Sequence, residues 1–69
     1  MITVYVCECI DNDLGEVVQV GMSLDKDIIQ NKADELNERV KAKRKFYNRF
    51  TNYGINTYIV TTDEYIAFN

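Results

Sequence analysis

Apolar residues in the first part of the chain alternate along the backbone, a pattern that is typical of β-strands. Residues 2–10 combine β-branched and aromatic side chains and predict a first strand. Its two faces carry Ile2, Val4 and Val6 on one side and Tyr5, Cys7 and Cys9 on the other. Because both faces are apolar, we expect this strand to lie in the centre of a sheet.

A turn and a second strand are expected next. Residues 11–15, DNDLG, are rich in turn-forming residues, and residues 16–22 return to a strand pattern. Two strands joined by a short turn predict an antiparallel hairpin. Since a hairpin alone is only marginally stable in water, other elements must pack against it.

The apolar spacing then changes to three, four and seven positions, which predicts a helix. Ser23 is the expected N-cap, because its hydroxyl can accept a hydrogen bond from an amide of the first turn, so the helix should begin near Leu24. One stripe of the helix carries Ile29, Ala33, Leu36, Val40, Tyr47 and Phe50. Residues 52–54, NYG, are its expected end. Such a helix would be about 42 Å long, whereas a domain of this size is about 28 Å across. It must therefore overhang the sheet or break near Lys43.

The last part of the chain, residues 55–68, returns to strand-forming residues. Asp63 and Glu64 interrupt the pattern, so this part forms either one strand or two. The order β-β-α-β predicts a single α+β domain over residues 1–69, with a three-stranded antiparallel sheet in the order 2-1-3 and one long or broken helix. If the helix covers the face that carries Val4, the opposite face is left exposed. Tyr5, Cys7 and Cys9 would then form a self-association face, and we expect a homodimer.

The composition agrees with a small globular protein. Of the 69 residues, 46% are hydrophobic and 28% are charged, which is outside the range typical of disordered chains. No apolar run reaches the roughly 20 residues that cross a bilayer. The N-terminal residues lack the basic start and the cleavage site of a signal peptide. We therefore expect a cytoplasmic protein without membrane association.

The charges are segregated along the sequence. Residues 1–38 contain nine acidic and two basic side chains, whereas residues 39–62 contain six basic and no acidic ones. The segment KAKRKFYNRF supplies the candidate partner-binding residues, which are Lys41, Lys43, Arg44, Lys45, Phe46, Tyr47, Arg49 and Phe50. Three interpretations stay open: the cationic end of a helix, a surface for an acidic protein, or a nucleic-acid site with stacking rings. The net charge of −3 counts against nucleic acid, so we favour a protein partner.

Catalysis is not expected from this sequence. The chain has no histidine, the residue that most often carries protons near neutral pH. Asp11, Asp13 and Glu16 are the only clustered carboxylates, and their spacing does not fit a calcium-binding loop. Two cysteines, Cys7 and Cys9, are too few for a structural zinc site in one chain. We predict a non-enzymatic protein with no metal and no cofactor.

The order of the first elements resembles that of a group of small proteins. An opening strand ITVYVCE, a turn, a second strand VVQVGMS and a helix that starts at SLDKD and carries ADELN resemble small uncharacterised proteins encoded by bacteriophages and mobile elements. The similarity covers roughly residues 1–40 and assigns no role to single residues. It implies that the chain binds a host factor, such as a host defence system, and redirects or inhibits it in the host cytoplasm.

Overall fold

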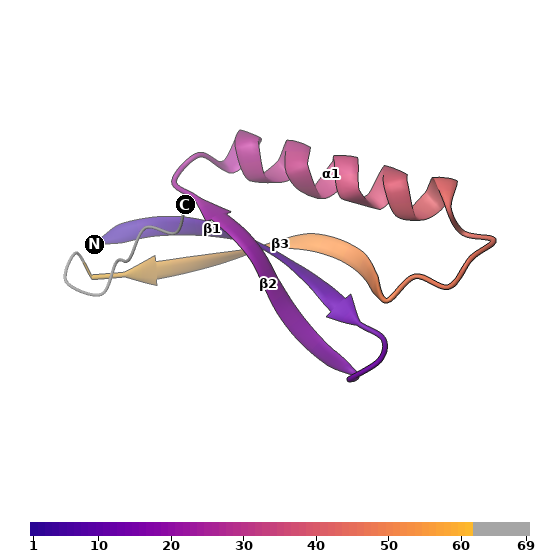
Figure 1. Cartoon of the computed structure of the whole chain (residues 1–69). Coiled ribbons are helices and arrows are strands. Elements are labelled where there is room, and N and C mark those ends of the chain that lie inside the picture. The colour runs from indigo at the N-terminus through magenta and orange to yellow at the C-terminus, as the bar shows by residue number, and fades with distance from the viewer. Residues whose placement is uncertain (62–69) are drawn as a thin grey trace.

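The computed structural model describes residues 1–61 and contains four elements in the order β-β-α-β (Figure 1). They are β1 (Ile2–Asp11), β2 (Glu16–Ser23), α1 (Lys26–Ala42) and β3 (Phe50–Val60). The three strands form one antiparallel sheet in the order β2-β1-β3. The predicted α+β fold and strand order are therefore confirmed. Residues 62–68, the second half of the predicted C-terminal strand region, lie outside the described residues.

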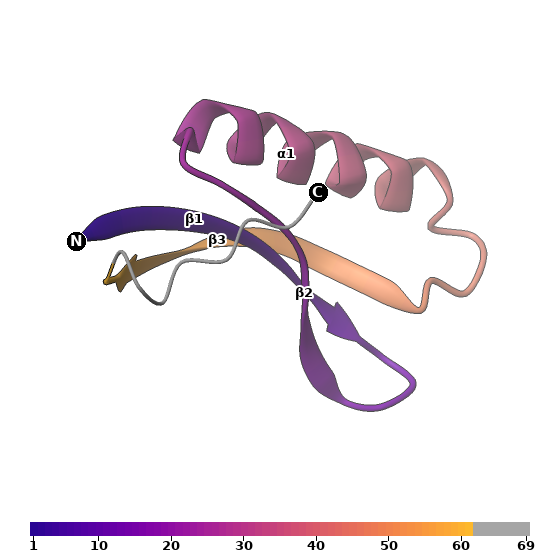
Figure 2. The ribbon, with the colours of Figure 1, turned by 60° about the vertical axis from the view of Figure 1, so that its left-hand side comes forward.

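Strand β1 is central because it pairs with both neighbours over most of its length. Each pairing contains one irregularity. The register with β2 shifts between Cys7 and Glu8, which leaves Val20 without an opposite residue. The register with β3 shifts between Glu8 and Ile10, so that two residues of β3 face one residue of β1. Such bulges increase the local twist of a sheet, and the strands cross at a clear angle in Figure 2.

Helix α1 begins two residues later than predicted. Asp25 is the N-cap, and its carboxylate accepts a hydrogen bond from the amide of Asp27. The hydroxyl of Ser23 accepts a hydrogen bond from the amide of Asp25 at 3.0 Å and so stabilises the turn before the helix. Serine and aspartate are both favoured N-cap residues, because the side chain of each can accept a hydrogen bond from a nearby backbone amide. A sequence with Ser23 and Asp25 two residues apart offers either choice.

Helix α1 ends at Ala42, with Lys43 as the C-cap residue. The predicted end at residues 52–54 is wrong, because these residues belong to β3. Tyr47 and Phe50 therefore lie beyond the helix, although their spacing continues its apolar stripe. Residues 43–49 connect the helix to β3 (Figure 1). Of the two alternatives expected from the sequence, an overhanging helix and a helix that breaks near Lys43, the structure shows the second. No second helix follows the break within the described residues.

The helix covers the face of β1 that the sequence led us to expect exposed. Cys7 forms a buried cluster with Ile29 and Ala33 of α1, and Tyr5, Tyr53 and Ile55 pack around it. Cys7 and Cys9 are 0% and 1% exposed. The small side chains of Cys7 and Ala33 allow the helix and the strand to approach closely. The prediction of an exposed self-association face made by Tyr5, Cys7 and Cys9 is therefore wrong.

The opposite face of β1 is also buried at its centre. Val4 and Val6 are both almost fully buried. A polar group adjoins them, in which the side-chain amide of Asn56 and the hydroxyl of Tyr58 donate to the carboxylate of Glu8 at 2.7 and 3.0 Å.

Helix α1, the one helix of the described residues, lacks the length and apolar character needed to span a membrane.

Candidate interaction surface

The segment between α1 and β3, residues 43–49, is called the basic loop below. It has a defined conformation that starts at the end of the helix. The amide of Phe46 donates to the carbonyl of Lys43 at 2.9 Å. The side-chain amide of Asn48 donates to the carbonyls of Lys43 and Phe46 at 3.3 and 3.2 Å. The bonds to Lys43 satisfy the carbonyl of the helix C-cap residue, so the loop is held close to the helix.

An ion pair joins the basic loop to the β1–β2 hairpin. The guanidinium of Arg49 donates from Nε and Nη2 to the two carboxylate oxygens of Asp11, each at 3.1 Å. Asp11 is 3% exposed, so its charge would be costly without this partner. The hydrogen bond from Arg49 lowers the pKa of Asp11, and the same contact raises the pKa of Arg49. Asp13 lies 3.4 Å from the Arg49 Nε and adds a second ion pair.

Asn12, at the tip of the same hairpin, binds the loop through its backbone and its side chain. Its amide donates to the carbonyl of Arg49 at 2.7 Å. Its side-chain amide donates to the carbonyl of Asn48 and to the hydroxyl of Thr51, both at 3.0 Å. The hydroxyl of Tyr47 donates to the carboxylate of Asp13, which raises the pKa of Tyr47. The hairpin turn therefore supports the basic loop from one side.

These contacts explain two of the three clustered carboxylates of the sequence, Asp11 and Asp13. Asp11 and Asp13 hold Arg49 and Tyr47, and Asp11 also accepts hydrogen bonds from the amides of Asp13 and Leu14 within the turn. In residues 1–61, no group of three or more His, Cys, Asp or Glu side chains is arranged to hold a metal ion. The carboxylates have a structural role in positioning the loop.

The basic loop exposes two aromatic rings and several cations. Phe46 and Tyr47 are 74% and 69% exposed. Four predicted contact residues lie beside them and are all exposed, namely Lys41, Lys43, Arg44 and Lys45. Within the described part of the chain, none of these four side chains forms an ion pair. The two other predicted residues are Arg49, whose guanidinium lies 5.2 Å from the ring centre of Phe50, and Phe50 itself. Arg49 anchors the loop to the hairpin, and Phe50 begins β3 opposite Asp11.

A hollow of about 340 Å³ lies between the end of α1 and the start of β3. It is called the basic groove below. Its lining combines apolar residues, called its apolar side below (Leu36, Val40, Phe50 and Tyr53), with the cations Arg39, Lys43 and Arg49 and with Tyr47 and Asn48. Arg39 forms a hydrogen-bonded ion pair with Glu35 on the helix surface. Leu36 and Val40 belong to the apolar stripe predicted for the helix, whereas the position of β3 beside them follows only from the structure.

The two cysteines are not reactive candidates in this fold. Both are free and buried. Burial raises the pKa of the Cys7 thiol and of the Cys9 thiol, although a hydrogen bond with Tyr53 partly opposes the shift at Cys9. A thiol with a raised pKa is mostly protonated at neutral pH and is a weak nucleophile. Cys7 fills the space beneath α1, where it packs against Ile29 and Ala33.

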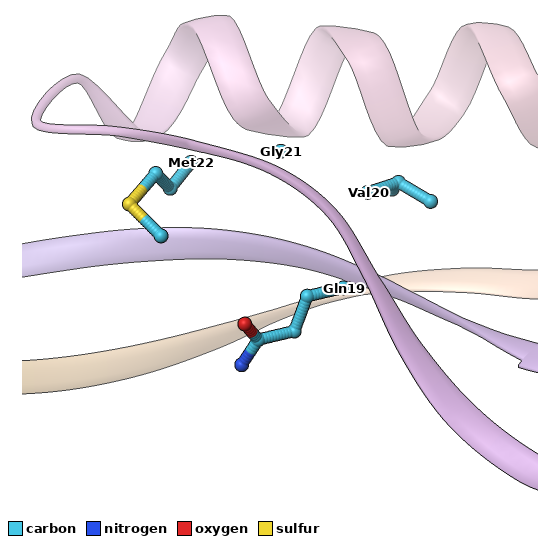
Figure 3. A pocket seen from close by; sticks show the side chains of 4 residues that line it. All are labelled: Gln19, Val20, Gly21 and Met22. Carbon is cyan, nitrogen blue, oxygen red and sulfur yellow. The ribbon is translucent and has the colours of Figure 1, made fainter. Parts of the chain in front are cut away.

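A second hollow of about 230 Å³ lies along the edge strand β2 and is lined by Gln19, Val20, Gly21 and Met22. Figure 3 shows Gln19 and Met22 extending away from α1, with Gly21 leaving a gap in the row of side chains. Val20 is the bulged residue of this strand. None of the residues 1–61 that line this hollow is charged.

No protein-family model matches this chain, and no curated protein or solved structure is similar enough to it to count as a match. Its function is therefore inferred from the chemistry of the basic loop and the basic groove. Among the described surfaces, these two combine exposed aromatic rings with unpaired cations.

Proposed function

We propose that this protein is a non-catalytic protein-binding module whose basic loop contacts an acidic surface of its partner. The observation that carries the proposal is the exposure of Phe46 and Tyr47 beside Lys43, Arg44 and Lys45 on a loop that the hairpin supports. Aromatic residues and arginine are enriched in protein interfaces, and tyrosine and arginine are frequent among the residues that supply most of the binding energy. The lysines add electrostatic complementarity to an acidic surface.

The support of the loop favours binding for a second reason. A mobile loop loses conformational entropy when it binds, and this loss weakens affinity. Here the contacts of Arg49 with Asp11 and of Asn12 with the loop carbonyls hold the segment before any partner arrives. Less order must therefore be gained on binding, and more of the contact energy contributes to affinity.

The resemblance of residues 1–40 to small phage-encoded proteins supports a more specific form of the proposal. The protein would be a modulator or inhibitor of a host factor, such as a host defence system, acting in the host cytoplasm. Binding alone can block a host factor, so this role needs no catalytic group. A single copy can also fill this role. The face that was expected to join two copies includes Cys7, which lies beneath α1.

Nucleic-acid binding is the second candidate, and one observation favours it. Exposed rings next to cations are also the combination that binds single strands, with bases stacked on the rings and phosphates on the cations. The acidic side chains Asp11 and Asp13 lie directly behind the loop, and the chain carries a net charge of −3. Both features repel a polyanion, so we rank a protein partner first.

A pair of charge-reversal variants tests the proposal. The first variant carries Arg44→Glu and Lys45→Glu in the basic loop. The control carries Lys26→Glu and Lys32→Glu in the N-terminal half of α1 and has the same change in net charge. Affinity capture from a host extract, followed by titration of the purified partner, should show binding at least about tenfold weaker for the loop variant. The α1 variant should bind like the wild type.

Two results would count against the proposal. Equal binding by both variants would remove the basic loop from the interface. Binding of a short single-stranded oligonucleotide that weakens steeply with added salt, and that only the loop variant loses, would favour nucleic acid instead, because counterion release makes such binding strongly salt-dependent. Circular dichroism spectra of both variants must match the wild type, since the substituted side chains are exposed.

A further inference from the structure

We propose that the basic groove receives an acidic peptide segment of the partner, with one large apolar side chain of that segment inserted between α1 and β3. The inference rests on the proposed protein-binding function and adds the position and chemistry of the contact. It places the anchor of the interface beside the basic loop, where Val40 and Tyr53 form the apolar side and Lys43 lies at the edge.

The size and lining of the groove suit an apolar anchor. Its volume of about 340 Å³ lies within the roughly 300–1,000 Å³ range of ligand pockets. Leu36, Val40 and Tyr53 are only partly buried, so covering them removes further apolar surface from water. Burial of such surface contributes roughly 25 cal/mol per Å². A leucine or aromatic side chain of the partner would supply the matching surface.

The charge at the edge of the groove selects an acidic segment. Lys43 has no ion pair among residues 1–61, and Lys41 and Arg44 are exposed on the neighbouring surface. Arg49 is bonded to Asp11 through Nε and Nη2. A guanidinium has five N–H donors, so Arg49 keeps donors that can bind a second carboxylate. A carboxylate of the partner can therefore be paired while the internal ion pair stays intact.

The same groove is a poor fit for a nucleic acid. Beside the rings of Tyr47, Phe50 and Tyr53, the groove is lined by the aliphatic side chains of Leu36 and Val40. These two cannot stack with a base as an aromatic ring does. Two of its three cations already have carboxylate partners, Glu35 for Arg39 and Asp11 for Arg49. A strand with a phosphate at every nucleotide would meet these carboxylates repeatedly. A peptide can place an apolar side chain between two acidic ones and avoid them.

Selection from a random peptide library tests the inference with the full-length protein as bait. The expected result is enrichment of peptides that combine Asp or Glu with a large apolar residue. A fluorescent copy of the enriched peptide is then titrated by anisotropy. Val40→Asp places a like charge in the groove and should weaken binding at least about tenfold. Thr57→Asp, at an exposed position of β3 outside the groove, is the matched control and should bind like the wild type.

The outcomes separate the inference from the proposed function. Loss of binding in the Arg44→Glu, Lys45→Glu variant but not in Val40→Asp would overturn the groove and leave the basic loop as the protein-binding site. Unchanged binding in both variants would overturn both. Displacement of the peptide by a short single-stranded oligonucleotide that binds more tightly would identify nucleic acid as the occupant and also overturn the inference. If Val40→Asp fails to fold, Arg39→Glu replaces it, with the same expected loss, because Arg39 is exposed, lines the groove and lies outside the basic loop.

Discussion

Asn37 of α1 binds the backbone of Tyr53 in β3 through two hydrogen bonds. Its side-chain amide donates to the Tyr53 carbonyl at 2.8 Å, and its side-chain oxygen accepts from the Tyr53 amide at 2.9 Å. Tyr53 lies in the bulge opposite Cys9, where it has no pairing partner in β1. The helix therefore supplies the hydrogen bonds that the sheet does not, and it fixes the distance between the two sides of the basic groove.

Replacing Asn37 should destabilise the protein at this joint. Asn37→Ala leaves a partly buried amide and carbonyl without partners, which costs about 1–3 kcal/mol of unfolding free energy. Asn37→Asp keeps the acceptor for the Tyr53 amide but places a carboxylate oxygen against the Tyr53 carbonyl oxygen in place of the donor, so it should destabilise the protein as well. Urea unfolding followed by circular dichroism measures both. Equal stability of wild type and Asn37→Ala would show that water replaces the two bonds at no cost.

The sequence predicted the strand order well but not the face that the helix covers. Strand β1 is apolar on both faces, and this feature indicated a central position. Because both faces are apolar, the difference in hydrophobicity that would identify the face packed against α1 is missing. Alternation with a period of two separates the faces but cannot rank them when both carry apolar residues. The decisive contact is between Cys7 and Ala33, two small residues whose pairing no spacing reveals.

The end of the helix and the supports of the basic loop were also beyond sequence patterns. Tyr47 and Phe50 continued the helical spacing, while β3 contains Asn52, Gly54 and Asn56, which disfavour a strand assignment. Pairing with β1 outweighs these weak local preferences. The ion pair between Arg49 and Asp11 joins residues 38 positions apart. The sequence contains eight basic and eleven acidic residues, and opposite charge alone does not indicate that Arg49 and Asp11 form an ion pair.

Acid should destabilise the protein through Asp11. Its pKa is lower in the folded protein than in the unfolded chain, because Arg49 stabilises the carboxylate. The unfolded chain therefore binds a proton first as the pH falls. The stability that the ion pair contributes is complete above the ordinary aspartate pKa of about 3.9 and is lost as the pH falls through the lower folded value.

The Asp11→Asn variant tests this origin of acid sensitivity. At neutral pH it should melt at a lower temperature than the wild type, because Arg49 loses its charged partner. Between neutral pH and strong acid its melting temperature should fall less than that of the wild type, since one titrating group has been removed. Thermal melts at a series of pH values measure the difference. Asp34→Asn, at an exposed position of α1, is the control and should retain the wild-type pH profile.

The two thiols should react slowly while the protein is folded. Cys7 is buried against Ile29 and Ala33 of α1, Cys9 is also buried, and burial raises both pKa values. Reaction with a disulfide reagent then requires local or global opening. An opening free energy of about 3 kcal/mol lowers the rate about a hundredfold relative to the unfolded chain. The absorbance of the released thiolate gives both rates, with and without denaturant. Rapid reaction of the folded protein would contradict the placement of the cysteine face under the helix.

Asn52 adopts a backbone conformation that most residues avoid, with a φ of 57° in the bulge of β3. Asparagine and glycine tolerate this left-handed region, whereas a β-branched side chain is strained there. Asn52→Val should therefore lower the unfolding free energy by about 1–2 kcal/mol, while Asn52→Gly should stay within about 1 kcal/mol of the wild type. Thr57→Val places the same side chain at a position of the same strand without a positive φ, and its stability should change little. Urea titrations of the three variants decide the matter. Equal losses in Asn52→Val and Thr57→Val would show that the bulge conformation carries no strain.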